Sequence, residues 1–202
     1  MFRSSLSSSK KKILVLGSSG YLGKKIFNYL NKKKNLKVFG QTRKKNSKYF
    51  SDFRTNKNFI KLLKKTKPNL IINTIANINV DKCELYPSIA LNDNVKTAKI
   101  ISNECIKNPK IKLIYISTDH VYNKRELSIE EKINPVNLYA KTKIIAEFYS
   151  LLAGGMVLRT NFLFKGKKNK MSLADLAFNK KLTIKLYKNI YFSPLYVDTF
   201  VN

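Results

Sequence analysis

The sequence contains few residues of the kinds that build metal centres and disulfide frameworks. It has two cysteines, Cys83 and Cys105, a single histidine, His120, and no tryptophan. Two cysteines are too few for a disulfide framework, and neither they nor the histidine stand in a metal-ligand spacing. We therefore expect two packed, reduced thiols and no bound metal.

Long apolar runs are also missing. No run approaches the roughly 20 residues that a membrane-spanning helix needs, and residues 1–12 lack the hydrophobic stretch of a secretion signal. We expect a cytoplasmic protein that does not contact a membrane. A hydrophobic share of 44% with 11% aromatic residues indicates a globular fold of one domain, or of one domain with a small appendage.

Acidic residues are scarce: 12 of them face 40 lysines and arginines, for a net charge of +28. Such a surplus would suit a nucleic-acid-binding protein. The lysines, however, are scattered in pairs and triplets along the whole chain rather than gathered in a stripe. We interpret them as a general preference for lysine and expect no specific nucleic-acid partner, although a positive field would attract an anionic nucleotide substrate.

Short apolar strands alternate with amphipathic helices along the chain. Strands are predicted at residues 12–16, 36–39, 70–73, 113–116 and 157–158, and helices between them, including a long one that Pro87 opens. This alternation predicts an α/β fold, a Rossmann-type doubly wound parallel sheet, which binds its ligands at the carboxyl ends of the strands.

A glycine-rich turn joins the first strand to the first helix. Gly17, Gly20 and Gly23 lack side chains, which lets the backbone turn tightly and approach a pyrophosphate at the positive end of the helix. The hydroxyl groups of Ser18 and Ser19 can add donors. The spacing differs by one residue from the commoner G-x-G-x-x-G, so an ordinary connecting loop remains the alternative.

The end of the second strand carries no acidic residue. A carboxylate at this point usually binds the ribose 2′-hydroxyl of NAD and repels the 2′-phosphate of NADP. Here the sequence reads Gln41-Thr42-Arg43-Lys44 instead. Arg43, together with Lys44, can pair with that phosphate, so NADP(H) is favoured as the cofactor and NAD(H) remains possible.

Tyr139 and Lys143 lie one turn apart on a predicted helix, and Thr118 follows the strand at 113–116. We predict that Thr118 hydrogen-bonds a substrate carbonyl and that Tyr139 transfers the proton. Lys143 would lower the pKa of the Tyr139 phenol from about 10 toward neutrality and bind the nicotinamide ribose. A capping turn at 117–119 is the structural alternative.

Consecutive motifs give the chain a family resemblance. It resembles an extended short-chain dehydrogenase/reductase, and within that group most resembles the dTDP-4-dehydrorhamnose reductase family, which reduces a 4-keto nucleotide sugar with NADPH or NADH. The motifs are Gly17 to Gly23, Asp52-Phe53, Asn73 to Ala76, Val80 to Glu84, Asn94, Ser117 to Val121, Glu131, Pro135 to Asn137, Tyr139 to Lys143, and Leu158 to Phe162.

The resemblance implies roles for particular residues. Thr118, Tyr139 and Lys143 would form the catalytic triad, and Tyr139 and Lys143 would also contact the cofactor. The other residues implied in cofactor binding are Gly17, Ser19, Gly20, Tyr21, Leu22, Gly23, Arg43, Asp52, Phe53, Thr74, Ile75 and Ala76. Within this set Asp52 and Phe53 would border the adenine.

The chain departs from the family pattern in several places. Ala140 replaces the usual glycine after the tyrosine, Asn77 stands where an aromatic residue is frequent, and the loop after Tyr122-Asn123 lacks a customary glycine. Family members also continue well beyond the segment at 192–198. We expect an NAD(P)-binding domain at residues 1–165 and a partial substrate-binding segment at 166–202, so that the C-terminal lobe is reduced.

A reduced lobe leaves several functions open. The substrate is held by a smaller pocket, or a partner or second copy in a homodimer completes the lobe, or the protein binds its cofactor without turnover. Reduction of a 4-keto nucleotide sugar is the leading hypothesis. The alternatives are a nucleotide-sugar epimerase or dehydratase of the same superfamily and a non-catalytic NADP-binding regulatory subunit.

Overall fold

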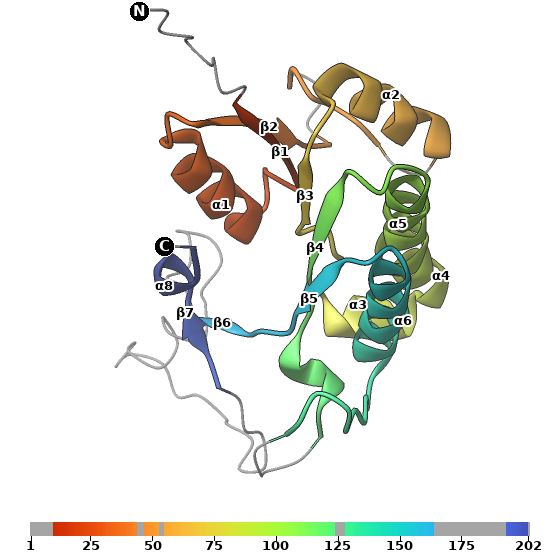
Figure 1. The fold of residues 1–202 in the computed structure, drawn as a ribbon. Coiled ribbons are helices and arrows are strands. Elements are labelled where there is room, and N and C mark those ends of the chain that lie inside the picture. The colour runs from red at the N-terminus through yellow and green to blue at the C-terminus, as the bar shows by residue number, and fades with distance from the viewer. Residues whose placement is uncertain (1–9, 44–46, 53–54, 124–127, 164–192, 202) are drawn as a thin grey trace, which may run out of the picture.

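A computed structural model describes residues 10–43, 47–52, 55–123, 128–163 and 193–201. Five parallel strands form one sheet in the order β2-β1-β3-β4-β5 (Figure 1). The strands are β1 (Lys11–Leu16), β2 (Leu36–Gln41), β3 (Leu70–Asn73), β4 (Lys112–Ile116) and β5 (Met156–Leu158). The predicted Rossmann-type parallel sheet is confirmed.

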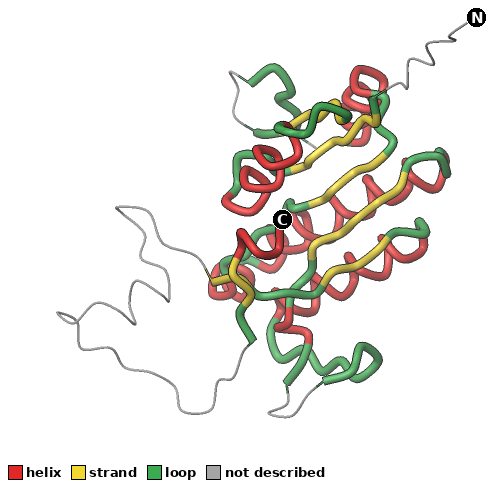
Figure 2. Tube along the Cα trace, turned by 60° about the vertical axis from the view of Figure 1, so that its left-hand side comes forward, coloured by secondary structure: helices red, strands yellow, loops and turns green. Residues whose placement is uncertain are grey.

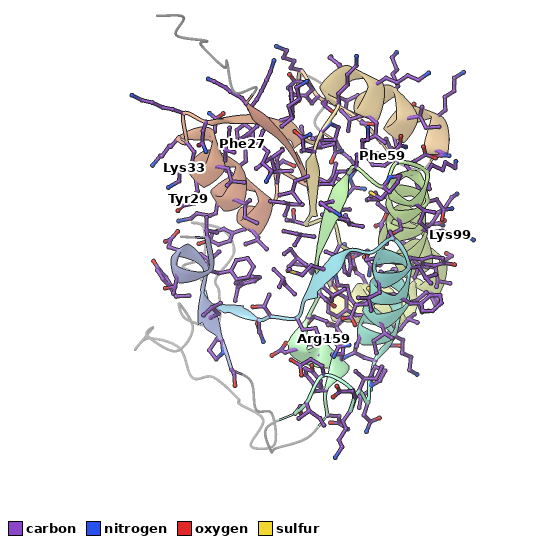
Figure 3. All side chains as sticks on the ribbon, viewed as in Figure 1. Phe27, Tyr29, Lys33, Phe59, Lys99 and Arg159 are labelled. Atoms are coloured by element: carbon purple, nitrogen blue, oxygen red, sulfur yellow. The ribbon has the colours of Figure 1, made fainter. Side chains whose placement is uncertain are left out.

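The sheet is covered on both faces, which explains why the buried stretches of its strands are continuous apolar runs. Alternate residues of β1 point to opposite faces: Leu14 and Leu16 belong to one core cluster, and Ile13 and Val15 to another. Side chains fill the space between the sheet and the helices on either side (Figure 3). Phe59, which is completely buried, lies on the side of the first cluster.

The helices divide between the two faces. On one face lies α1 (Tyr21–Asn31), and on the other lie α2 (Asn56–Thr66), α5 (Thr97–Lys107) and α6 (Leu138–Leu152) (Figures 1 and 2). The chain leaves β1 through α1 to pair β2 with it, and then returns through α2 to place β3 on the other edge of β1. This reversal of strand order opens the crevice in which such sheets bind ligands.

The strand register brings three chain segments together at one edge. The last residue of β1, Leu16, is aligned with Gln41 of β2 and with Asn73 of β3. The residues that follow these strands therefore emerge side by side. Among the described residues, Gly17, Arg43 and Thr74, all predicted to bind a cofactor, directly follow these strands or lie within two residues of their ends.

The segment after β3 differs from the prediction. A short helix, α3 (Val80–Leu85), was not expected; the side chain of Asn79 caps it by accepting a hydrogen bond from the backbone N–H of Lys82 at 2.8 Å. The helix that Pro87 opens is present, but part of it is π-helical rather than α-helical. It consists of α4 (Pro87–Ala90), a π-helical turn η1 (Leu91–Lys96) and α5.

The C-terminal residues return to the sheet beside α1. Two short strands, β6 (Phe162–Leu163) and β7 (Leu195–Tyr196), form a separate parallel pair, and α8 (Val197–Val201) follows. Phe200 packs against the core cluster under α1, and Lys25 of α1 pairs with Asp198 at 2.7 Å. The predicted boundary between residues 165 and 166 lies outside the described residues. None of the helices in the described ranges combines the length and the apolar character needed to cross a membrane.

Candidate functional site

The glycine turn between β1 and α1 is packed so tightly that side chains do not fit. Gly17 has a φ of 78°, and a Cβ atom there would lie 2.8 Å from the hydroxyl oxygen of Thr74. A Cβ on Gly23 would lie 2.7 Å from the same oxygen. That hydroxyl donates to the carbonyl of Leu16 at 2.7 Å. Thr74, predicted to line the cofactor, thus holds the turn against the end of β3.

The first turn of α1 has the form of an anion site. Gly20 is the N-cap residue and offers no side chain, so the N–H groups of the first helical turn receive no side-chain cap. Tyr21 and Leu22 begin the helix, and Ser19 is exposed just before it. Backbone N–H groups and the helix dipole at such an end favour a phosphate group.

Gln41, which the sequence analysis did not single out, fastens this turn to β2. Its side chain is buried; Oε1 accepts from the N–H of Gly17 at 3.0 Å, and Nε2 donates to the carbonyl of Ser51 at 2.6 Å. Its own carbonyl accepts from the Ser18 hydroxyl at 2.8 Å. A glutamine at a strand end carries no sequence signal for such a role, because its burial depends on the register of β1 and β2.

A pocket opens beside the turn, at the carboxyl ends of β2 and β3. Its lining residues are Gln41, Arg43, Ser51, Asp52, Ile75, Ala76, Asp93 and Thr97. Four of these were predicted to bind the cofactor: Arg43, Asp52, Ile75 and Ala76. Phe53, the other residue predicted to border the adenine, lies outside the described residues. The pocket lies where the resemblance implies the adenosine half of a dinucleotide.

Arg43 projects at the mouth of this pocket opposite an acidic residue. Its side chain is 69% exposed, and Nη1 lies 4.0 Å from Oδ1 of Asp93. The other carboxylate oxygen of Asp93 accepts from the side-chain amide of Asn77 at 3.4 Å. Asp93 was not predicted to belong to the site, because only the π-helical turn and the fold place it beside the end of β2.

Thr118 lies directly after β4 and has two partners. Its hydroxyl oxygen accepts from the backbone N–H of His120 at 3.2 Å, which caps the short 3-10 helix Asp119–Val121. Its side chain also lies close enough to the Tyr139 hydroxyl to lower the pKa of that phenol in part. The capping alternative and the predicted meeting with Tyr139 are therefore both present. The His120 ring meets the Tyr139 ring edge-on at 5.7 Å between centroids.

Tyr139 does not have the lowered pKa that the sequence analysis predicted. Burial raises the pKa of its phenol to about 12; the nearby side chain of Thr118 lowers it in part, and the charge of Asp119 adds to the rise. The prediction that Lys143 lowers this pKa is wrong for the described arrangement. The amine of Lys143 instead donates to the carbonyl of Ile116 at 2.7 Å.

Lys143 itself is the strongly shifted base. Its side chain is buried, with Nζ 4.1 Å from the centre of the Tyr115 ring. Desolvation lowers the pKa of this amine to about 7, and the charge of Glu147 opposes that effect. Lys143 belongs to α6, but its amine lies against the last residue of β4. A lysine there that titrates near neutrality is the kind of group found at functional sites.

Helix α6 holds these groups through its N-terminal half. Asn137 caps it by accepting from the N–H of Ala140 at 2.8 Å, and Glu84 of α3 accepts from the N–H of Leu138 at 2.6 Å. Asn94, buried in the π-helical turn, donates to the hydroxyl of Thr142 at 2.9 Å. These contacts fix the helix against α3 and η1 and thereby set the position of the Tyr139 side chain.

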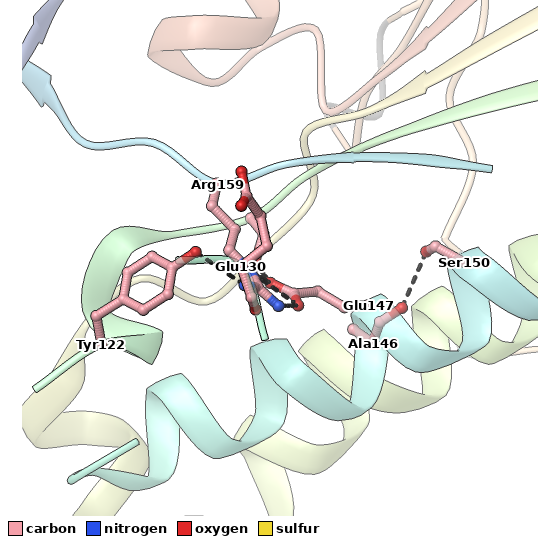
Figure 4. A network of polar contacts seen from close by, with 7 residues as sticks. Tyr122, Glu130, Ala146, Glu147, Ser150 and Arg159 are labelled. Atoms are coloured by element: carbon pink, nitrogen blue, oxygen red, sulfur yellow. Dashed lines mark hydrogen bonds and ion pairs between the residues drawn. The ribbon is translucent and has the colours of Figure 1, made fainter. Parts of the chain in front are cut away.

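An ion pair between buried Glu147 and partly buried Arg159 fixes the other end of the site, and neither residue was predicted to have a role there. Arg159 donates to both carboxylate oxygens of Glu147, with the shortest contact at 2.7 Å, and to the hydroxyl of Tyr122 at 2.8 Å (Figure 4). Ser117 also donates to Glu147. Glu147 lies four residues after Lys143 on the buried face of α6, which was the available signal. The network ties α6 to the ends of β4 and β5.

Comparisons with known proteins agree with this arrangement. A dTDP-4-dehydrorhamnose reductase of Aggregatibacter actinomycetemcomitans is 28% identical over 160 residues, which cover 76% of this chain and 52% of the relative. The solved structure of such a reductase from Clostridium acetobutylicum superimposes with a TM-score of 0.79 at 26% identity, over 94% of this chain and 67% of that one. Another, from Bacillus anthracis in complex with NADP, gives 0.70 at 22% identity, over 79% and 56%.

The chain spans about half the length of the curated relatives it matches. The family model described as the RmlD substrate binding domain nevertheless matches residues 11–200, which is nearly the whole chain. The protein therefore belongs to the RmlD substrate binding domain family, and the resemblance to dTDP-4-dehydrorhamnose reductases that its motifs indicated is confirmed.

Proposed function

We propose that the protein is an NAD(P)H-dependent oxidoreductase that reduces the keto group of a 4-keto nucleotide sugar, with NADPH favoured. The observation that carries the proposal is that the side chains of Thr118 and Tyr139 lie close together, with Lys143 one turn further on, at the same sheet edge as the glycine turn. An alcohol, a phenol and an amine from distant parts of the chain thus gather at the edge where a dinucleotide would bind.

The residues present fit a dinucleotide. Gly17 and Gly23 leave the backbone bare beside the uncapped start of α1, which suits a pyrophosphate. The pocket that Asp52, Ile75 and Ala76 line suits an adenosine, and Arg43 offers a guanidinium to a 2′-phosphate. The reductase from Bacillus anthracis was solved with NADP, which supports the same cofactor here. When bound, a reduced nicotinamide would supply a hydride to the carbonyl carbon.

The chain's own residues would supply the proton. Because burial raises the pKa of Tyr139 to about 12, its hydroxyl remains protonated at neutral pH, which is the form that a proton donor requires. A developing alkoxide is more basic than a phenolate, so transfer to it remains favourable. Thr118, which lies beside this hydroxyl, can bind the same substrate oxygen. Lys143 would hold the cofactor ribose beside them.

The substrate class rests on the relatives. Those with the printed name dTDP-4-dehydrorhamnose reductase act on a sugar attached to a nucleotide, and the net charge of +28 favours the approach of such an anion. We therefore propose a 4-keto, 6-deoxy sugar carried on a nucleoside diphosphate. We propose this activity for the 202-residue chain, which spans about half the length of the curated relatives it matches.

The direct test is to incubate the purified protein with NADPH and dTDP-4-keto-6-deoxy sugar and to follow the absorbance of the reduced nicotinamide. Net consumption that requires both components is the expected result. Binding of NADPH without consumption would contradict the proposal and favour a regulatory subunit. Conversion of the sugar without consumption would contradict it in favour of an epimerase or dehydratase.

The Tyr139→Phe variant tests the proton donor. It removes one hydroxyl and keeps the ring, so we expect the rate to fall by at least about 100-fold while NADPH affinity stays close to that of the unmodified protein. Tyr149→Phe, on the same helix, is the matched control and should retain activity. An equal loss of binding and turnover in Tyr139→Phe would mean that the residue is structural.

A further inference from the structure

The pocket at the ends of β2 and β3 contains opposite charges that face each other. Among the described residues that line the pocket, Arg43 is the one with a positive charge. Asp93 lies across from it, with Nη1 of Arg43 4.0 Å from Oδ1 of Asp93. The two residues come from different elements, the end of β2 and the π-helical turn.

Asp93 is held in place rather than extended into solvent. Its side chain is 30% exposed, and its second oxygen accepts from Asn77 at 3.4 Å. The backbone N–H of Asn77 in turn donates to the side chain of buried Asn94 at 2.7 Å. A chain of hydrogen bonds therefore fixes the carboxylate at the pocket wall, where Arg43 is more exposed and can turn toward it.

Asp93 and a 2′-phosphate would compete for the same guanidinium. A phosphate that pairs with Arg43 takes it from Asp93 and also approaches a like charge, whereas a 2′-hydroxyl can donate a hydrogen bond to a carboxylate. We propose that Asp93 weakens the preference of this pocket for a 2′-phosphate over a 2′-hydroxyl by holding the Arg43 guanidinium and by adding a like charge beside the phosphate position. This inference rests on the dinucleotide binding of the proposed function.

The size of the effect follows from the exposure of the pair. An exposed ion pair contributes at most about 1 kcal/mol, which is about fivefold in affinity. We therefore expect Asp93 to change the ratio of the two affinities by about fivefold and not to abolish binding of either dinucleotide.

The test compares dissociation constants of NADP⁺ and NAD⁺, measured by titration calorimetry, in the unmodified protein and in Asp93→Asn. We expect the variant to bind NADP⁺ about fivefold more tightly relative to NAD⁺. The matched control is Asp81→Asn, which removes one exposed carboxylate from α3 outside the pocket and should leave the ratio unchanged. Retained NAD⁺ binding shows that each variant is folded.

The outcomes separate this inference from the proposed function. An unchanged ratio in Asp93→Asn, or an equal change in Asp81→Asn, overturns the role of Asp93 and leaves the reductase proposal standing, since NADP⁺ still binds. Failure of the unmodified protein to bind either dinucleotide overturns both. The change in ratio should also shrink as the salt concentration rises, because exposed charges are screened.

Discussion

The buried amine of Lys143 makes the folded protein less stable at neutral pH, because burial disfavours its charged form. Its amine is buried above the Tyr115 ring and has one hydrogen-bond acceptor, the carbonyl of Ile116. Burial disfavours its charged form more than Glu147 favours it, and the pKa falls from 10.5 to about 7. Between these values the folded chain binds fewer protons at this site than the unfolded chain, so folding becomes more favourable as pH rises.

The Lys143→Met variant isolates this contribution. Methionine keeps an unbranched side chain without the amine, so the variant should be more stable than the unmodified protein near pH 7. The difference in the free energy of unfolding should shrink by at most about 1.4 kcal/mol for each pH unit as pH rises to 10. Urea denaturation of both proteins across this range measures it. A difference that stays constant with pH would mean that Lys143 is charged and paired in the folded state.

At the scale of elements, the turn from β1 into α1 depends on glycines where no side chain fits. Alanine is a better helix former than glycine by about 1 kcal/mol, and Gly23 lies inside α1. The gain is outweighed because a Cβ atom there would meet the backbone of Gly17 and the Thr74 hydroxyl. We expect Gly23→Ala to lower the free energy of unfolding by about 1–3 kcal/mol and to weaken NADP⁺ binding.

Denaturation and titration calorimetry on Gly23→Ala measure these two effects. Asn28→Ala, an exposed substitution further along α1, is the control and should leave both quantities close to those of the unmodified protein. If Gly23→Ala proved as stable as the control and bound NADP⁺ equally well, the turn would have room to move and its tight packing would not define the site.

The elements that the sequence predicted are those whose signals are local. The run from Leu70 to Asn73 is apolar, ends at a polar residue and forms β3 with the predicted bounds. The π-helical turn at Leu91–Lys96 could not be predicted in the same way, because no residue in it breaks an α-helical pattern. Its buried Asn94 bonds Asn77 and Thr142, which are distant in sequence.

The same limit applied to the functional site: residues with local signals could be predicted, and contacts that depend on the fold could not. Thr118 and Tyr139 were expected to meet because each follows or begins an element at the same sheet edge, and their side chains lie close enough for Thr118 to affect the pKa of the phenol. The partner of Lys143 was not predictable, since the choice between a phenol and the carbonyl of Ile116 depends on how far α6 lies from β4. Glu147 and Arg159 pair for a similar reason: only the fold shows which buried charges meet.

The charge of the whole molecule is unevenly spread. Helices α1 and α2 carry no acidic residue, whereas Glu84, Asp93 and Asp119 lie on or near the segments that follow β3 and β4. The lysines are therefore balanced mainly around the carboxyl edge of the sheet. A ligand drawn by the general positive field would meet several of these acids at the carboxyl edge, where Asp93 faces Arg43.

The described C-terminal residues are packed against α1 and the parallel sheet. Phe200 of α8 contacts the cluster of Ile13, Val15, Ile26 and Ile72, and its ring meets that of Phe162 at 5.0 Å between centroids. Residues 193–201 should therefore unfold together with the sheet. We expect Phe200→Ala to lower the free energy of unfolding by about 1–3 kcal/mol in a single transition.

Urea denaturation followed by circular dichroism measures this change, with Thr199→Ala, an exposed substitution on the same helix, as the control. The transition midpoint of Phe200→Ala should fall while its slope stays that of the unmodified protein, because the surface exposed on unfolding is nearly the same. A midpoint equal to that of Thr199→Ala, or a second transition, would mean that α8 is not part of the unit that holds α1 against the sheet. Residues 193–201 would then have to be treated as separate from the parallel sheet.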